Sequence, residues 1–137
     1  MHRRTNVVLD GSISLPPGIL LLVALLESSI DQRVDLCLCG VILTEVLQGI
    51  LDDEQHKRTE SILSSLTTLP MDQSTFLLAA NIYRTLRSRG ITMRNSVDCV
   101  IAAVCIEGRA HLLHSDGDFD HIADVFDLQV LGRGAVR

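Results

Sequence analysis

Short apolar runs alternate with longer segments of helical periodicity along this chain, and that alternation limits the possible folds more than any other feature. Segments 43–51 and 97–105 each place apolar residues at spacings of three, four, seven and eight, the pattern of an amphipathic helix. Further helices are predicted at 16–29, 54–66, 72–89 and 118–125. Buried strands are predicted for the short apolar runs 6–9, 34–39, 110–114 and 128–131. Because strands that alternate with helices pair in parallel, the pattern predicts an α/β fold.

The size and charge of the chain narrow the class of protein. Its 137 residues suit a single domain, 1–137, with room for a stable core. The net charge of −5 argues against a protein that grips nucleic acid through bulk positive charge. Only Lys57 among the twelve basic residues is a lysine, and the arginines suit bidentate contacts with phosphate or carboxylate.

The N-terminal part has only a superficial likeness to a secretory signal. The apolar run at 19–26 follows the basic residues Arg3 and Arg4, but Pro16 and Pro17 interrupt the interval, and eight apolar residues cannot cross a bilayer. We therefore expect a soluble, cytoplasmic protein without membrane contact. The cysteines at positions 37, 39, 99 and 105 are expected to be reduced, buried thiols rather than disulfide partners or zinc ligands.

Four acidic residues that are far apart in the sequence are predicted to meet at one edge of the sheet. Asp10 and Asp116 each follow a short apolar strand, so both lie at the carboxyl edge, where open α/β sheets bind their ligands. Glu45 and Asp98 fall in the first turn of helices that begin at the same edge. Clustered carboxylates repel one another. A hard cation such as Mg²⁺ or Mn²⁺ removes that repulsion and can activate water against a phosphodiester.

Each acid also has a purely structural explanation. Asp98 follows Asn95 by three residues and suits a helix N-terminus, and Asp10 precedes a glycine, as turn residues do. Glu45 falls opposite the apolar stripe of its helix, as a solvated residue does, and Asp118 suits the cap of the last helix. The convergence of four acids on one edge favours the functional interpretation.

The segments that carry these acids occur in an order that is typical of one protein family. Three of them match the acidic motifs of that family closely: 40–49, 92–103 and 112–123. In this order they resemble the PIN-domain family, and specifically the VapC-type toxins of bacterial toxin–antitoxin pairs. The first segment keeps Asp10 but departs from the family pattern, because Gly11 replaces the usual threonine and Ser14 replaces an aromatic residue.

The resemblance implies both a fold and an activity. The fold is a three-layer α/β/α sandwich with a mostly parallel central sheet. The activity is that of a ribonuclease which depends on Mg²⁺ or Mn²⁺ and cleaves RNA with metal-activated water. The implied catalytic residues and metal ligands are Asp10, Glu45, Asp98 and Asp116, with Asp118 as a further metal ligand. The resemblance also implies a homodimer and a cognate antitoxin protein that silences the enzyme.

Three other functions stay open at this point. The strand followed by Asp116 and Asp118 also suits a phosphatase of the haloacid-dehalogenase kind, in which Asp116 would be the nucleophile, although that motif normally opens its domain. The spacing of Asp116, Asp118 and Asp120 suits a calcium-binding loop, but His121 stands where such a loop needs glycine. The third is a catalytically impaired PIN fold that only binds a partner.

Two further features concern partners. Four arginines that precede Asp98 are candidates for RNA contacts, with a solvated helix end as the alternative: Arg84, Arg87, Arg89 and Arg94. The predicted helix at 19–26 is apolar on every face, so we expect a partner to cover one of its sides.

Overall fold

Five parallel strands form one sheet in the computed structural model, which describes residues 5–9, 34–113 and 117–131. The strands are β1 (Thr5–Leu9), β2 (Val34–Leu38), β3 (Thr67–Thr68), β4 (His111–Leu113) and β5 (Gln129–Leu131). Their order across the sheet is β3-β2-β1-β4-β5, and every neighbouring pair is parallel. The predicted α/β class and parallel pairing are therefore confirmed.

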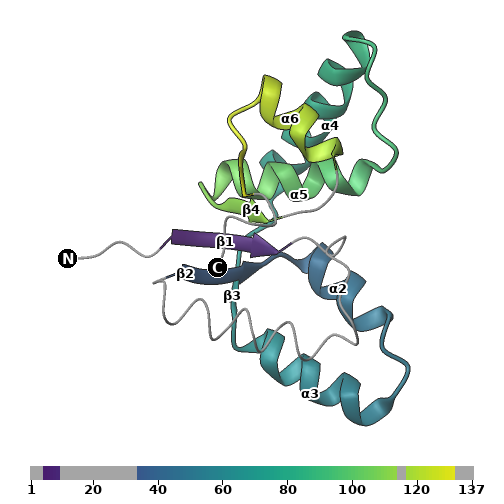
Figure 1. Cartoon of the computed structure of the whole chain (residues 1–137), viewed down its shortest axis with the longest axis vertical. Coiled ribbons are helices and arrows are strands. Elements are labelled where there is room, and N and C mark those ends of the chain that lie inside the picture. The colour runs from purple at the N-terminus through teal and green to yellow at the C-terminus, as the bar shows by residue number, and fades with distance from the viewer. Residues whose placement is uncertain (1–4, 10–33, 114–116, 132–137) are drawn as a thin grey trace, which may run out of the picture.

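The winding direction of the sheet reverses between β1 and β4. From β1 the chain proceeds to β2 and β3 on one side, and from β4 it proceeds to β5 on the other. Because crossovers between parallel strands are right-handed, this reversal places the helices of the two halves on opposite faces. Figure 1 shows the result: α2 (Gly40–Gln48) and α3 (Asp53–Ser64) lie on one side of the sheet, and α4 (Gln73–Ser88), α5 (Ser96–Glu107) and α6 (Asp118–Val125) lie on the other. The expected three-layer sandwich is confirmed.

Helix α5 lies at the centre of the core. Its residues Cys99 and Ile101–Cys105 are buried, so the helix is covered nearly all round. The contact between α4 and α5 is the most extensive among the described elements, and α5 also contacts α2, α6 and β4. All four cysteines of the chain are buried and free, in agreement with the prediction of buried thiols.

Helix α2 differs from its prediction at both ends. It begins at Gly40, so Glu45 lies in its second turn and not in the first as expected. It ends at Gln48 with Gly49 as its C-cap, and the apolar stripe therefore runs past the helix, where Leu51 is 95% exposed. A glycine commonly ends a helix, and here its effect outweighs the periodicity of the flanking residues.

The remaining elements follow their predictions within two residues, with two exceptions. Strand β3 was not predicted, because two threonines on an exposed edge carry no apolar signal. The predicted helix at 16–29 lies outside the described residues. Gly90 follows the C-cap of α4 with a positive φ of 83°, a conformation that glycine adopts without strain at the end of a helix. Within the described ranges, no helix has the length and apolarity needed to span a membrane.

Candidate active site

The carboxyl ends of β1 and β4 meet at the point where the sheet reverses its winding. Leu9 and Leu113 end these two strands and are register partners. A reversal of strand order leaves a crevice outside the carboxyl ends, which is where α/β sheets bind ligands. Asp10 and Asp116 follow these strand ends in the sequence, but both lie outside the described residues. Their predicted roles stay predictions.

Asp98 lies in the first turn of α5, as predicted. The side chain of Asn95 caps this helix by accepting a hydrogen bond of 3.0 Å from the Val97 N–H. The half-buried Asp98 carboxylate therefore stands beside the positive end of a helix whose next turns are buried. The packing of α5 fixes the position of this acid.

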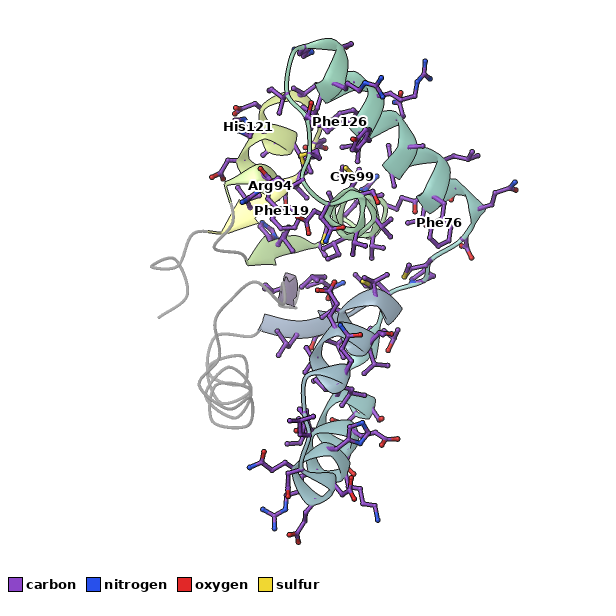
Figure 2. The ribbon with its side chains drawn as sticks, turned by 90° about the vertical axis from the view of Figure 1, so that its right-hand side faces the viewer. Phe76, Arg94, Cys99, Phe119, His121 and Phe126 are labelled. Carbon is purple, nitrogen blue, oxygen red and sulfur yellow. The ribbon has the colours of Figure 1, made fainter. Side chains whose placement is uncertain are left out.

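Asp118 is the first residue of α6, and an arginine contacts it. Gly117 occupies the N-cap position, so the prediction that Asp118 caps the helix is wrong by one residue. Arg94, in the loop before α5, places its Nε atom 3.4 Å from Asp118 Oδ2. Figure 2 shows Arg94 on the side of α5 where α6 carries Phe119 and His121, with Phe76 on the opposite side.

The thiol of Cys99 lies close to both acids of this region. Burial raises the pKa of Cys99 from 9.0 to about 11, and the negative charges of Asp98 and Asp118 add to the effect. Asp98 lies in the first turn of α5 and Asp118 begins α6, and these two helices contact each other and start at the carboxyl edge of the sheet. The structure thus brings two of the five predicted acids together, with Arg94 beside them.

Glu45 is exposed on α2 and lies near a second buried thiol. Burial raises the pKa of Cys39, the N–H groups of Ile42 and Val41 lower it, and the charge of Glu45 raises it. In the part of the chain that the structure describes, no three His, Cys, Asp or Glu side chains are grouped to hold a metal ion.

The four candidate arginines separate into two groups. Arg84 and Arg87 are exposed on α4, and Arg89 is its exposed C-cap. Arg94 contacts an acid of the site, through the 3.4 Å approach to Asp118 described above. Sequence reasoning placed all four on an equal footing and did not find the pairing with Asp118, since a contact across 24 residues leaves no local pattern.

Comparisons with known proteins agree on one family. A family model described as PIN domain matches residues 5–125. Ribonuclease VapC11 of Mycobacterium tuberculosis is 39% identical over 100 residues, which cover 72% of this chain and 75% of that protein. A VapC ribonuclease of Mycobacterium bovis matches with the same identity and coverage.

Solved structures share the fold at low sequence identity. VapBC2 of Rickettsia felis, bound to a promoter DNA fragment, aligns with a TM-score of 0.72 and 16% identity over 93% of this chain and 98% of that one. VapBC-1 of nontypeable Haemophilus influenzae aligns with a TM-score of 0.71 and 21% identity over the same shares. A VapBC-5 structure from Mycobacterium tuberculosis aligns with a TM-score of 0.67 and 20% identity, again over 93% and 98%.

Proposed function

Because this chain belongs to the PIN domain family, we propose that it is a metal-dependent endoribonuclease and the toxin of a toxin–antitoxin pair. The observation that carries the proposal is the pair of acids, Asp98 and Asp118, at the carboxyl edge of a parallel sheet where its winding reverses. It is supported by 39% identity to proteins named VapC ribonucleases. Such an enzyme would act in the cytoplasm, where its RNA substrate is found.

The proposed metal ligands are those predicted from the sequence: Asp10, Glu45, Asp98, Asp116 and Asp118. Carboxylate oxygens are the donors that Mg²⁺ and Mn²⁺ prefer, so the residue types fit the ion. The described residues alone do not complete a site, and the two acids that follow β1 and β4 supply the missing donors in this proposal. When bound, the ion supplies activation of water and neutralisation of charge on the phosphodiester. The chain itself fixes Asp98 on a buried helix and excludes solvent behind it.

RNA contacts are proposed for the arginines around the end of α4. Arg84, Arg87 and Arg89 are exposed there. Guanidinium groups pair with phosphate through two parallel hydrogen bonds, which suits a protein with a net charge of −5 that cannot rely on bulk attraction.

A cognate antitoxin is the proposed regulator of this site. The structural neighbours named VapBC are described as members of toxin–antitoxin systems or as DNA-bound complexes. We expect the partner to direct a cationic side chain at the acids, where it would compete with the metal.

A homodimer is proposed through the outer face of α4. Phe76 is 49% exposed and Leu77 is 65% exposed on this face. Beside them lies an open groove of about 360 Å³, lined by Phe76, Ala79, Ala80, Tyr83, Arg84, Ser96 and Val100. The exposed side chains and the groove belong to the same surface. In a two-fold symmetric dimer, the exposed side chains of each copy would therefore pack into the groove of the other copy.

Light scattering tests this dimer. We expect Phe76→Glu to convert a dimer into a monomer, while Leu51→Glu, at a leucine that is 95% exposed on the other side of the sheet, leaves the dimer intact. If both variants remain dimeric, the dimer interface does not include this face of α4.

RNA cleavage by the purified chain tests the activity. We expect the wild type to cleave total RNA with Mg²⁺ or Mn²⁺ and to stop in excess EDTA. Asp98→Asn should lower the rate by on the order of 100-fold or more, because it removes a ligand charge. Asp124→Asn, at an exposed acid of α6, is the matched control and should cleave normally.

The outcomes of this experiment separate the competing functions. Cleavage that continues in EDTA would contradict the metal mechanism. A wild-type chain that binds its partner but cleaves no RNA with any metal would favour the impaired PIN fold. Release of phosphate from a phosphomonoester, without RNA cleavage, would favour the phosphatase.

A further inference from the structure

Arg94 contacts Asp118, one of the acids of the proposed active site. Its Nε atom lies 3.4 Å from Asp118 Oδ2, and its side chain is 78% exposed while that of Asp118 is 16% exposed. The carboxylate is thus largely enclosed by protein, and the guanidinium extends from it into solvent. A positive charge is presented outward beside the acids.

The backbone on both sides of Arg94 is anchored. The preceding residue, Met93, is 3% exposed in the core, and the following residue, Asn95, caps α5 with its side chain. The backbone of Arg94 is therefore held by the loop, and its side chain is held at Nε by Asp118. A preorganised arginine of this kind loses less conformational entropy when it binds a ligand.

The charges in this contact favour an anion over a cation. A divalent ion bound to Asp118 would stand against the guanidinium and be repelled, whereas a phosphate would be attracted to it. The planar guanidinium also matches phosphate geometry through two parallel N–H donors. Asp118 is thus better suited to holding Arg94 than to holding a metal ion.

We propose that Arg94 binds a backbone phosphate of the RNA next to the cleaved bond, and that Asp118 is a positioning residue which holds Arg94 for that purpose. The proposal rests on the ribonuclease function proposed above and changes one part of it. Asp118, predicted as a metal ligand, becomes a support for substrate binding, and the metal set is reduced to Asp10, Glu45, Asp98 and Asp116.

Binding measurements on the full chain test this assignment apart from catalysis. A fluorescein-labelled oligouridylate in EDTA reports RNA affinity at several salt concentrations, and calorimetry with Mn²⁺ alone reports metal affinity. The variants are Arg94→Ala, Arg94→Lys, Asp118→Asn and the double variant of Arg94→Ala with Asp118→Asn. The matched control is Arg58→Ala, because Arg58 pairs with Glu54 at 3.5 Å on exposed α3, away from the site.

We expect Arg94→Ala to weaken RNA binding about ten-fold, the low end for a charge-assisted hydrogen bond. The slope of log affinity against log salt should fall by about 0.7, the value for one phosphate contact on a single strand. Arg94→Lys should keep that slope but recover only part of the affinity. Asp118→Asn should weaken RNA binding in the wild-type background and have little further effect in Arg94→Ala, because both residues act through one contact. Mn²⁺ affinity should stay within about two-fold in Asp118→Asn, and Arg58→Ala should bind RNA as the wild type does.

Two results would overturn the assignment. A loss of Mn²⁺ affinity of ten-fold or more in Asp118→Asn would make Asp118 a metal ligand. Unchanged RNA affinity in Arg94→Ala, together with a lower melting temperature, would make the contact a structural tether. The ribonuclease proposal fails separately, if the wild-type chain cleaves no RNA. The binding measurements in EDTA do not depend on cleavage and test the role of Arg94 in either case.

Discussion

Thr75 joins the two helices that form the most extensive contact in the molecule, and its hydroxyl should account for a measurable part of the stability. Thr75 is 1% exposed, accepts a 3.0 Å hydrogen bond from the N–H of Asp72 and donates a 2.5 Å hydrogen bond to Glu107 Oε1 at the end of α5. Ser74 donates to the other oxygen of Glu107 at 2.7 Å. The N-terminus of α4 is thereby fastened to the C-terminus of α5.

Thr75→Val removes both hydrogen bonds while keeping the shape of the side chain. The contact at the start of the helix contributes about 1 kcal/mol and a hydrogen bond to a charged group about 1.5–3 kcal/mol. Glu107 is exposed, so we take the lower value for that bond and expect a loss of about 2–3 kcal/mol in the free energy of unfolding. Thr75→Ser keeps the hydroxyl and loses one methyl group, at about 1 kcal/mol.

Urea unfolding followed by far-UV circular dichroism measures both variants, because the chain has no tryptophan for fluorescence. RNA cleavage at a temperature well below unfolding should stay normal, since Asp98 lies nine residues along α5, or about 14 Å, from Glu107. A Thr75→Val variant within 0.5 kcal/mol of the wild type would refute the reasoning. So would a Thr75→Ser variant as unstable as Thr75→Val.

Three further outcomes are expected. Phe119→Ala should lower the free energy of unfolding by about 3–5 kcal/mol in urea, because the fully buried ring would leave a cavity; a smaller loss would mean that α6 closes over it. Arg109→Gly should raise the free energy by about 0.5–1 kcal/mol, because Arg109 has a φ of 51° that glycine adopts more readily; a loss would show that the arginine side chain stabilises this end of α5. Cys99 has a pKa raised from 9.0 to about 11 by burial and by Asp98 and Asp118, so the folded state keeps a proton that the unfolded state releases. Its contribution is therefore complete below pH 9 and is lost as the pH rises towards 11, and Cys99→Ala should flatten this part of the stability–pH curve measured by urea unfolding. An equally steep curve in that variant would assign the loss to another group.

The sequence predicted the fold well where hydrophobic burial alone determines the structure. Helix α5 is an example, because its apolar residues are the ones buried against the neighbouring helices and β4. The prediction failed where burial gives no signal. Strand β3 consists of two exposed threonines held by pairing with β2, and the end of α2 depends on Gly49 rather than on the apolar residues that follow it.

The site was predictable to the extent that topology determines it. Acids that follow parallel strands, or begin the helices that return to them, are expected at one edge, and Asp98 and Asp118 lie in the first turns of two helices that start there. The contact between Arg94 and Asp118 does not follow from the rule. It depends on the angle at which α6 packs beside the loop before α5, and that angle is set by side-chain packing across the whole core.

The position of β1 in the middle of the sheet has a consequence for the time at which this protein acquires its activity. The first strand to leave the ribosome pairs with β2 early, but its other neighbour is β4, and Val7 meets His111 more than a hundred residues later. Pairing over such a distance forms slowly and cannot begin until most of the chain has been synthesised. In the function proposed above, the edge between β1 and β4 would therefore be completed only after β4 docks, late in the synthesis of the chain.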